Sequence, residues 1–228
     1  QIIIRASDEY KEIDYDIFKH LPRLAAECIK AKFPMSLEFG RGAAGHSVYK
    51  IKNPSFSTKR IYLGDKCLLE YRTTGSYSIF AGELDLKEKA KPNQVTQAVE
   101  IEDSELIKIF YEAAALAQLY LIAPKGDGWN NLILSYGGEC KEQGLEEEFT
   151  QRIFEDCLEL HNRHDRKKET NKSIAGIYKK DGNSNIFSKN FPIPIDDAAK
   201  HHIREVLKSL GTKELEPLEV QRYNSDEL

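Results

Sequence analysis

The spacing of apolar residues changes partway along this chain, and that change sets the fold class. Up to about residue 80, short β-branched and aromatic runs are separated by glycine turns, a pattern typical of strands. From Asp103 onward, apolar residues recur at intervals of three and four, as they do in packed helices. At 228 residues the chain is long enough for two units. We therefore expect an α+β protein, with an α/β core over residues 1–100 and a helical bundle over residues 101–228.

The same patterns predict individual elements. Strands are expected over Ile2–Ile4, Ser36–Phe39, His46–Ile51, Arg60–Leu63, Cys67–Arg72 and Tyr77–Phe80. A helix is expected over residues 17–29, ended by Pro34, and residues 81–103 are polar enough for a linker. Further helices are expected over residues 103–120, 129–143, 145–160 and 196–210, with a shorter one over 169–178. The first of these is offered N-cap oxygens by Asp103 and Ser104.

Composition narrows the class of protein. No apolar run approaches the roughly 18 residues that a membrane span needs, and the mean hydropathy is −0.54. We expect a cytoplasmic protein with no membrane partner. The four cysteines are far apart and form no CxxC pair, which favours buried free thiols over a zinc site or a disulfide framework. Because the chain starts at Gln1, we expect it to be a fragment of a longer protein.

A pair of carboxylates near the start of the chain is the first candidate for chemistry. Asp14 and Asp16 are separated by one residue and come just before the first helical stretch. If residues 12–16 are extended, the strand period of two places both carboxylates on one side. Such a pair forms a hard-oxygen site suited to Mg²⁺ or Mn²⁺. The alternative is a solvated surface or the start of the following helix.

Two later segments add donors and a third acid. The glycine-rich segment 39–50 contains Arg41 and His46, and glycines let a backbone come close to a phosphate whose oxygens these side chains can bind. An ordinary hairpin turn is the alternative. In the apolar strand 68–72, Glu70 and Arg72 share one face, so each either meets solvent or has a partner. A cross-strand ion pair is the competing explanation.

The order of these segments resembles the three motifs of the archaeo-eukaryotic primase superfamily. Those motifs are a DxD-type pair, an SxH or GxH motif, and a strand of two hydrophobic residues and an acid. The primase-polymerases of viruses and plasmids are the most similar group. Phe39-Gly40-Arg41 leading to His46 and Tyr49 matches their second motif, and Leu68-Leu69-Glu70-Tyr71-Arg72 followed by Gly75 matches the third. The resemblance covers most of residues 13–165.

The resemblance implies an RRM-like catalytic core followed by a helical region, with DNA primase or polymerase activity in mobile-element replication. Nucleoside triphosphates and a single-stranded DNA template would be its partners, and a helicase domain in the parent protein is a further one. Asp14, Asp16 and Glu70 would hold Mg²⁺ or Mn²⁺ and form the catalytic centre. His46 would contact the phosphates of the incoming nucleotide, with Arg41 and Arg72 as further phosphate contacts. The family has an α/β segment before its first motif, whereas only about a dozen residues precede Asp14, so part of the core is expected to be missing.

A basic cluster offers a place for the template. Residues 163–180 hold seven basic side chains against two acids, and we expect DNA contacts from Arg163, Arg166, Lys167 and Lys168. A solvated helix face is the alternative. Two other functions stay open: a catalytically inactive module that binds single-stranded DNA or a replication origin, and a metal-dependent nuclease that uses the same acids.

Overall fold

The computed structural model describes residues 2–41, 44–85, 88–92, 97–180 and 195–211. Within these ranges it leaves out the side chains of residues 2–4, 40, 41, 44, 77, 79–85 and 88–92. The strands are β1 (Ile2–Arg5), β2 (Tyr10–Asp14), β3 (Leu37–Arg41), β4 (Ala44–Lys52), β5 (Lys59–Leu63), β6 (Lys66–Arg72), β7 (Tyr77–Asp85), β8 (Glu88–Pro92) and β9 (Val99–Glu102). The α-helices are α1 (Arg23–Lys30), α2 (Asp103–Ile122), α3 (Trp129–Glu142), α4 (Glu147–Leu160), α5 (Lys167–Lys179) and α6 (Asp197–Gly211). Two short 3-10 helices are η1 (Asp16–Lys19) and η2 (His164–Arg166). The α+β prediction is confirmed.

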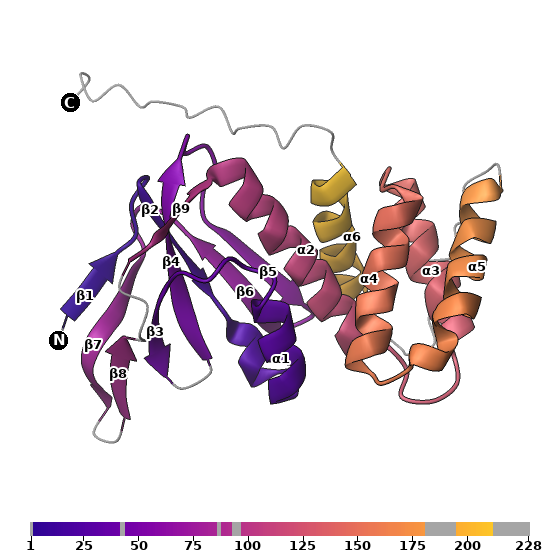
Figure 1. Cartoon of the computed structure of the whole chain (residues 1–228), viewed down its shortest axis with the longest axis horizontal. Coiled ribbons are helices and arrows are strands. Elements are labelled where there is room, and N and C mark those ends of the chain that lie inside the picture. Colours follow the sequence, from indigo (N-terminus) through magenta and orange to yellow (C-terminus); the bar gives the residue numbers. More distant parts are fainter. Residues whose placement is uncertain (1, 42–43, 86–87, 93–96, 181–194, 212–228) are drawn as a thin grey trace.

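The strands form one sheet in the order β1-β7-β8-β3-β4-β2-β6-β5, and β9 adds to β4. In its central part β2 lies between β4 and β6, antiparallel to both, while β9 runs parallel to β4. Figure 1 shows the sheet at one end of the molecule and helices α3, α4 and α5 at the other, with α2 reaching between them. A strand as central as β2 has side chains covered on both faces, which makes its sequence unlike that of an edge strand.

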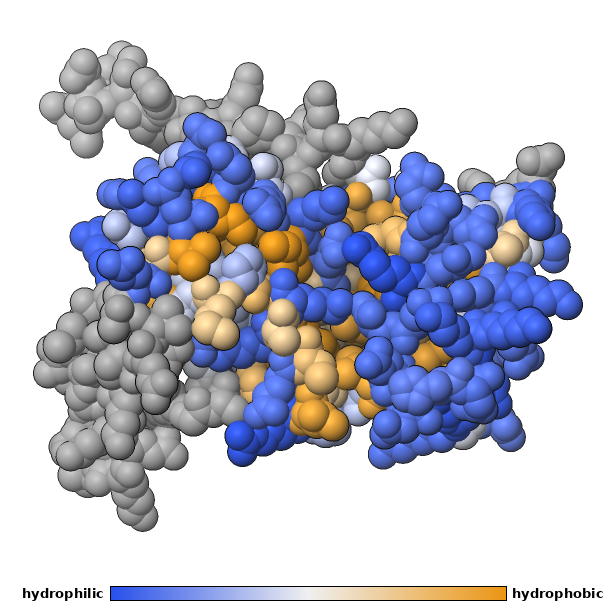
Figure 2. Space-filling view, viewed as in Figure 1, coloured by the Kyte–Doolittle hydropathy of each residue, from blue (hydrophilic) through white to orange (hydrophobic). Residues whose placement is uncertain are grey.

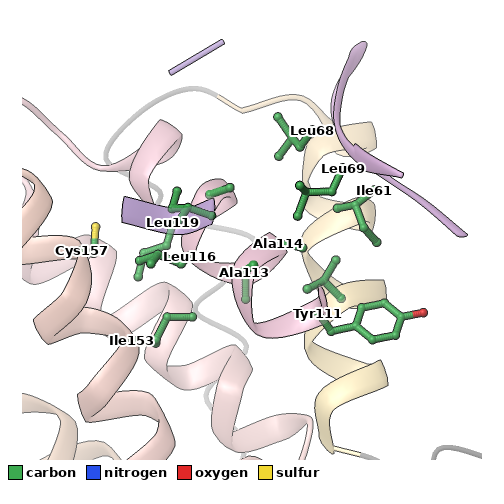
Figure 3. Packing of buried hydrophobic residues seen from close by; sticks show 14 of the residues in the cluster. Ile61, Leu68, Leu69, Tyr111, Ala113, Ala114, Leu116, Leu119, Ile153 and Cys157 are labelled. Carbon is green, nitrogen blue, oxygen red and sulfur yellow. The ribbon is translucent and has the colours of Figure 1, made fainter. Parts of the chain in front are cut away.

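The apolar core lies between the sheet and α2. Ile13 of β2 and Tyr71 of β6 are fully buried on this side, and α2 is buried around almost its whole circumference. Such a helix is expected at the centre of a structure, with neighbours on every side. Figure 3 shows the cluster passing from Ile61, Leu68 and Leu69 of the sheet through Tyr111, Ala113, Ala114, Leu116 and Leu119 of α2 to Ile153 and Cys157 of α4.

Hydrophilic and hydrophobic residues are distributed unevenly over the surface. On the face drawn in Figure 2, hydrophilic residues cover most of the helical end, and hydrophobic residues gather across the middle of the molecule. Leu24 of α1 and Met35 are the most exposed of the large hydrophobic residues that the structure describes, at 72% and 75%. No helix in the described ranges combines the length and the apolar character required to traverse a bilayer.

Several sequence predictions need correction. The helix expected over residues 17–29 is split into η1 and α1, because Pro22 has no N–H to donate and stands at the N-cap of α1. The linker expected over residues 81–103 is wrong, since β8, β9 and the end of β7 lie there. Asp103 does not cap α2, because Glu102 is the N-cap residue. Of the cysteines, Cys140 and Cys157 are buried as expected, whereas Cys28 is exposed and Cys67 half-buried.

Candidate functional site

Three neighbouring strands bring together acids and a histidine that are far apart in the sequence. In the register of the sheet, Asp14 of β2 lies opposite His46 of β4 and also opposite Glu70 of β6. Residues directly opposite each other share a face of the sheet, with Cβ atoms roughly 5 Å apart. Asp14 Oδ1 is 3.8 Å from His46 Nδ1. The structure thus brings together three of the residues expected at the site.

Glu12 is a fourth member of this face, and sequence reasoning missed it. It precedes Asp14 by two positions on β2, lies opposite Arg72, and is only 1% exposed. Its Oε1 lies 2.5 Å from His46 Nδ1 and accepts a hydrogen bond of 2.7 Å from the Ser78 hydroxyl of β7. Its Oε2 is buried and has no hydrogen-bond partner among the described residues. An orphaned carboxylate oxygen in the interior points to a cation or a proton donor that binds there.

Arg72 joins the carboxylates to one another. Its Nη2 is 2.5 Å from Asp14 Oδ2, its Nε is 2.7 Å from Glu70 Oε2, and its Nη1 is 3.2 Å from Glu12 Oε1. The expected sharing of a face by Glu70 and Arg72 is seen here as a direct ion pair. Most of the guanidinium fork is occupied by these acids, so Arg72 orders the carboxylates, and its expected contact with phosphate stays a prediction.

The electrostatics of the two strand acids differ. Burial acts to raise the pKa of Glu12, but the nearby imidazole of His46, the Ser78 hydroxyl and Arg72 together lower it below its ordinary value. Burial also raises the pKa of Asp14, and there the opposing charges of His46 and Arg72 do not prevail, since Asp16 and Glu70 add repulsion. The raised pKa of Asp14 thus comes first from burial, and repulsion from Asp16 and Glu70 is a smaller contribution.

His46 is held from two sides. Its ring stacks on Phe39 of β3, with centroids 5.0 Å apart and planes 12° from parallel, and Glu12 lies against Nδ1. The side chain keeps 22% of its surface exposed. A histidine fixed at one ring nitrogen has a set orientation for the other, which is how a carboxylate partner orients a functional imidazole.

Asp16 reaches the site by a route that differs from the expected one. The strand ends at Asp14, and Tyr15, with φ −100° and ψ 67°, turns the chain into η1. The prediction that residues 12–16 are extended is therefore wrong, and the carboxylates sharing the strand face are Glu12 and Asp14. Asp16 still approaches the others: its carboxylate, that of Glu70 and the Cys67 thiol lie within 4.8 Å of one another.

The donor atoms that lie together are only in part those of a hard-cation site. Asp16 and Glu70 bring carboxylate oxygens, the ligands that Mg²⁺ and Mn²⁺ prefer, but the third member of their cluster is the Cys67 thiol. Asp14, the third expected ligand, is opposite Glu70 in the sheet and is paired with Arg72, so a metal site of Asp14, Asp16 and Glu70 stays a prediction. The opposing charges come from Arg72, from Arg60, whose Nε is 2.9 Å from Glu70 Oε1, and from Lys19, which pairs with Asp16. Glu12 Oε2, by contrast, has no hydrogen-bond partner among the described residues.

The glycine-rich segment is described only in part. Gly45 lies so close to β3 that a Cβ there would be 2.8 Å from the Phe39 carbonyl oxygen, so a larger residue would force the two strands apart. Arg41 ends β3, but its side chain and residues 42–43 are outside the described part of the chain. The expected contact of Arg41 with phosphate stays a prediction.

The basic residues expected to bind DNA lie elsewhere. Arg163, Arg166, Lys167 and Lys168 are at η2 and the start of α5, at the end of the molecule opposite the sheet (Figure 1). Arg163 Nη2 donates to the Lys125 carbonyl at 2.8 Å, and Lys167 Nζ is 2.8 Å from Glu155 Oε2. The structure does not bring this cluster together with the acids of the sheet.

Sequence and structure thus locate one site, on the face of the sheet opposite the apolar core. Its function has to be inferred from its own geometry, because comparisons of the chain with protein-family models, with curated proteins and with solved structures gave no match in any of the three.

Proposed function

We propose that this chain is a metal-dependent nucleotidyltransferase that extends or primes DNA on a single-stranded template, with the sheet as the RRM-like core of a primase-polymerase of a mobile element. The observation that carries the proposal is the convergence of Asp14, His46 and Glu70 on three adjacent strands. Each of them belongs to a different segment that resembles a family motif. If the resemblance were accidental, the polar residues of these three segments would not be expected to lie side by side on one face of the sheet.

Each group has a distinct task in this proposal. Asp14, Asp16 and Glu70 hold Mg²⁺ or Mn²⁺, and such ions stabilise the attacking and the leaving oxygens of a phosphoryl displacement. His46, oriented by Glu12 and by the Phe39 ring, donates a hydrogen bond to a phosphate oxygen of the incoming triphosphate. Arg72 keeps the strand acids in a fixed geometry, so binding energy is not spent on ordering them.

The direct test is incorporation of a labelled nucleotide at a primer end, and synthesis without a primer, by the purified chain in Mg²⁺ or Mn²⁺. Glu70→Gln keeps the size of the side chain and removes its charge, and we expect the rate to fall by about 100-fold or more. The matched control is Glu27→Gln on α1, an exposed acid paired with Arg23, which is expected to leave the rate unchanged. Equal rates for wild type and Glu70→Gln would sink the proposal.

A second candidate, a catalytically inactive module that binds single-stranded DNA, is favoured by one specific observation. Arg60 and Arg72 each contact Glu70, so the carboxylate is already paired. In that case a divalent ion with a nucleoside triphosphate has no site on the native state and leaves the melting temperature unchanged. The nucleotidyltransferase is expected to melt several degrees higher under the same conditions. Incubating single-stranded DNA with and without nucleotides separates both from a nuclease, which shortens the strand.

A further inference from the structure

A polar groove lies between β5 and α6, beside the carboxylate site. It has a volume of about 360 Å³. Its lining includes Lys59, Arg60 and Tyr62 from β5, Tyr111 from α2, and His202 and Glu205 from α6. A volume of this size falls within the roughly 300–1,000 Å³ typical of small-ligand sites.

The charges and rings of this groove suit a particular kind of ligand. Two basic side chains face one acid, Glu205, although the chain as a whole carries a net charge of −4. The rings of Tyr62 and His202 lie 5.8 Å apart with planes tilted by 36°. Basic side chains next to aromatic faces combine contact with a phosphate and stacking on a base, which is how sequence-tolerant single-strand binding sites are built.

The two ring nitrogens of His202 differ in their surroundings from those of its neighbour. Nδ1 of His202 is shielded from solvent and has no hydrogen-bond partner among the described residues. Because this nitrogen is shielded from solvent, it is other atoms of the His202 side chain that can meet a ligand in the groove. The adjacent His201 is exposed, so the two histidines of this pair differ in their surroundings.

The groove and the proposed transfer site share one residue, Arg60. Arg60 lies opposite Glu70 in the β5–β6 register, and its Nε is 2.9 Å from Glu70 Oε1. Arg60 therefore contacts the acid site and is also one of the residues that line the groove. A strand whose end reaches Glu70 therefore also meets Arg60 of β5.

We infer that the groove between β5 and α6 binds a nucleotide unit of a single DNA strand next to the transfer site. Lys59 and Arg60 contact its phosphate, and Tyr62 and His202 contact its base. The inference rests on the proposed function, in which a single DNA strand is the substrate. It assigns DNA binding to this groove instead of the basic cluster of η2 and α5.

The experiment measures anisotropy of a labelled single-stranded oligonucleotide titrated with the full 228-residue chain at several salt concentrations. Lys59→Gln is compared with Lys168→Gln, the same charge change made in the cluster at the far end of the molecule. We expect Lys59→Gln to weaken binding several-fold and to lower the slope of log affinity against log salt by about one. Lys168→Gln is expected to bind like wild type.

A second pair of variants tests the base contact. His202→Ala is expected to weaken oligonucleotide binding by about five-fold or more, whereas His201→Ala has no effect. Melting temperatures of both variants establish that any loss is not due to unfolding.

The outcomes separate the possibilities. Unchanged binding by both Lys59→Gln and His202→Ala overturns the inference, and so does a loss confined to Lys168→Gln. If a free nucleoside triphosphate displaces the oligonucleotide from wild type but not from His202→Ala, the groove is a mononucleotide site and the strand assignment fails. Nucleotide incorporation by wild type is measured in parallel, with Glu70→Gln as the inactive reference. Strand binding by wild type without any incorporation contradicts the proposed function and leaves this inference standing.

Discussion

At the scale of single residues, Glu12 decides how the candidate site is organised. It is a charged side chain in the interior of the sheet, contacted from β4 by His46, from β6 by Arg72 and from β7 by Ser78. Buried charge is tolerated only with such partners. The partners are invisible in the sequence, where Glu12 follows Lys11 and the pair resembles a polar loop. This is why sequence patterns predicted Asp14, Glu70 and His46 but neither Glu12 nor Ser78.

Glu12→Gln is predicted to slow nucleotide incorporation by about ten-fold or more, because His46 loses the anion that orients it. The effect is expected mainly in KM for the nucleotide, and Glu12→Asp should restore part of it. Since Glu12 acts through His46, the change should have little further effect in a His46→Ala background. Independent, multiplicative effects of the two substitutions would show that Glu12 does not position the imidazole.

At the scale of elements, a buried ion pair connects the sheet to α2. Lys11 Nζ is 2.6 Å from Asp103 Oδ2, on the face of β2 opposite Glu12. The Ser55 and Phe56 N–H groups and the Tyr71 hydroxyl also donate to Asp103. One carboxylate thus fixes the start of α2 against β2, β6 and the segment before β5. Sequence reasoning assigned this side chain to capping because its partners are far away in the chain.

The Asp103→Asn variant is predicted to lose about 3–5 kcal/mol of unfolding free energy at pH 7, because Lys11 is left buried without its counter-charge. Burial acts to raise the pKa of Asp103, but Lys11 and the other donors lower it below its ordinary value of 3.8. The higher unfolding free energy of wild type relative to Asp103→Asn is therefore fully present above about pH 4. It shrinks as the pH falls through the lowered pKa of Asp103 in the folded state.

Urea unfolding at pH 7 and at pH 3 measures this dependence. Asp197→Asn is the matched control, since Asp197 is fully exposed at the start of α6 and pairs only with Lys200 in the described structure. It is expected to change stability by less than about 1 kcal/mol. A difference between wild type and Asp103→Asn that stays constant between the two pH values would contradict the assigned role of the carboxylate.

The patterns of the sequence predicted elements well wherever a simple period held. The expected strands over 46–51, 60–63 and 67–72 and the helices over 103–120 and 129–143 match β4, β5, β6, α2 and α3 within a few residues. β2 was missed because both of its faces are covered, one by apolar groups and one by charged partners, so its residues do not alternate in polarity. β8 was missed because its sequence, EKAKP, is polar and contains a proline.

At the scale of the whole molecule, the sheet and the helices share one hydrophobic core. The buried cluster includes residues on both sides of residue 100, and α2 contributes to it along its whole length. The division into units of residues 1–100 and 101–228 stays a prediction, but a continuous core has a consequence for unfolding. Parts that share a core lose their structure together.

We therefore predict a single unfolding transition. Trp129, the only tryptophan, lies in the helical part, so its fluorescence and the far-ultraviolet circular dichroism of the whole chain should give coincident curves. Leu116→Ala in α2 should lower the unfolding free energy by about 2–5 kcal/mol and shift both curves equally. Separate midpoints, or a shift of the fluorescence curve alone, would establish two independent units.

The most direct measurement of the central claim is the initial rate of nucleotide incorporation as a function of Mn²⁺ concentration. Wild type is predicted to show saturable activation, and chelation should abolish the activity. Asp14→Asn, which alters the acid between His46 and Glu70, should lower the maximal rate by about 100-fold or more. Incorporation that needs no divalent ion, or that proceeds equally well in Asp14→Asn, would contradict the assignment of this row of residues as the catalytic centre.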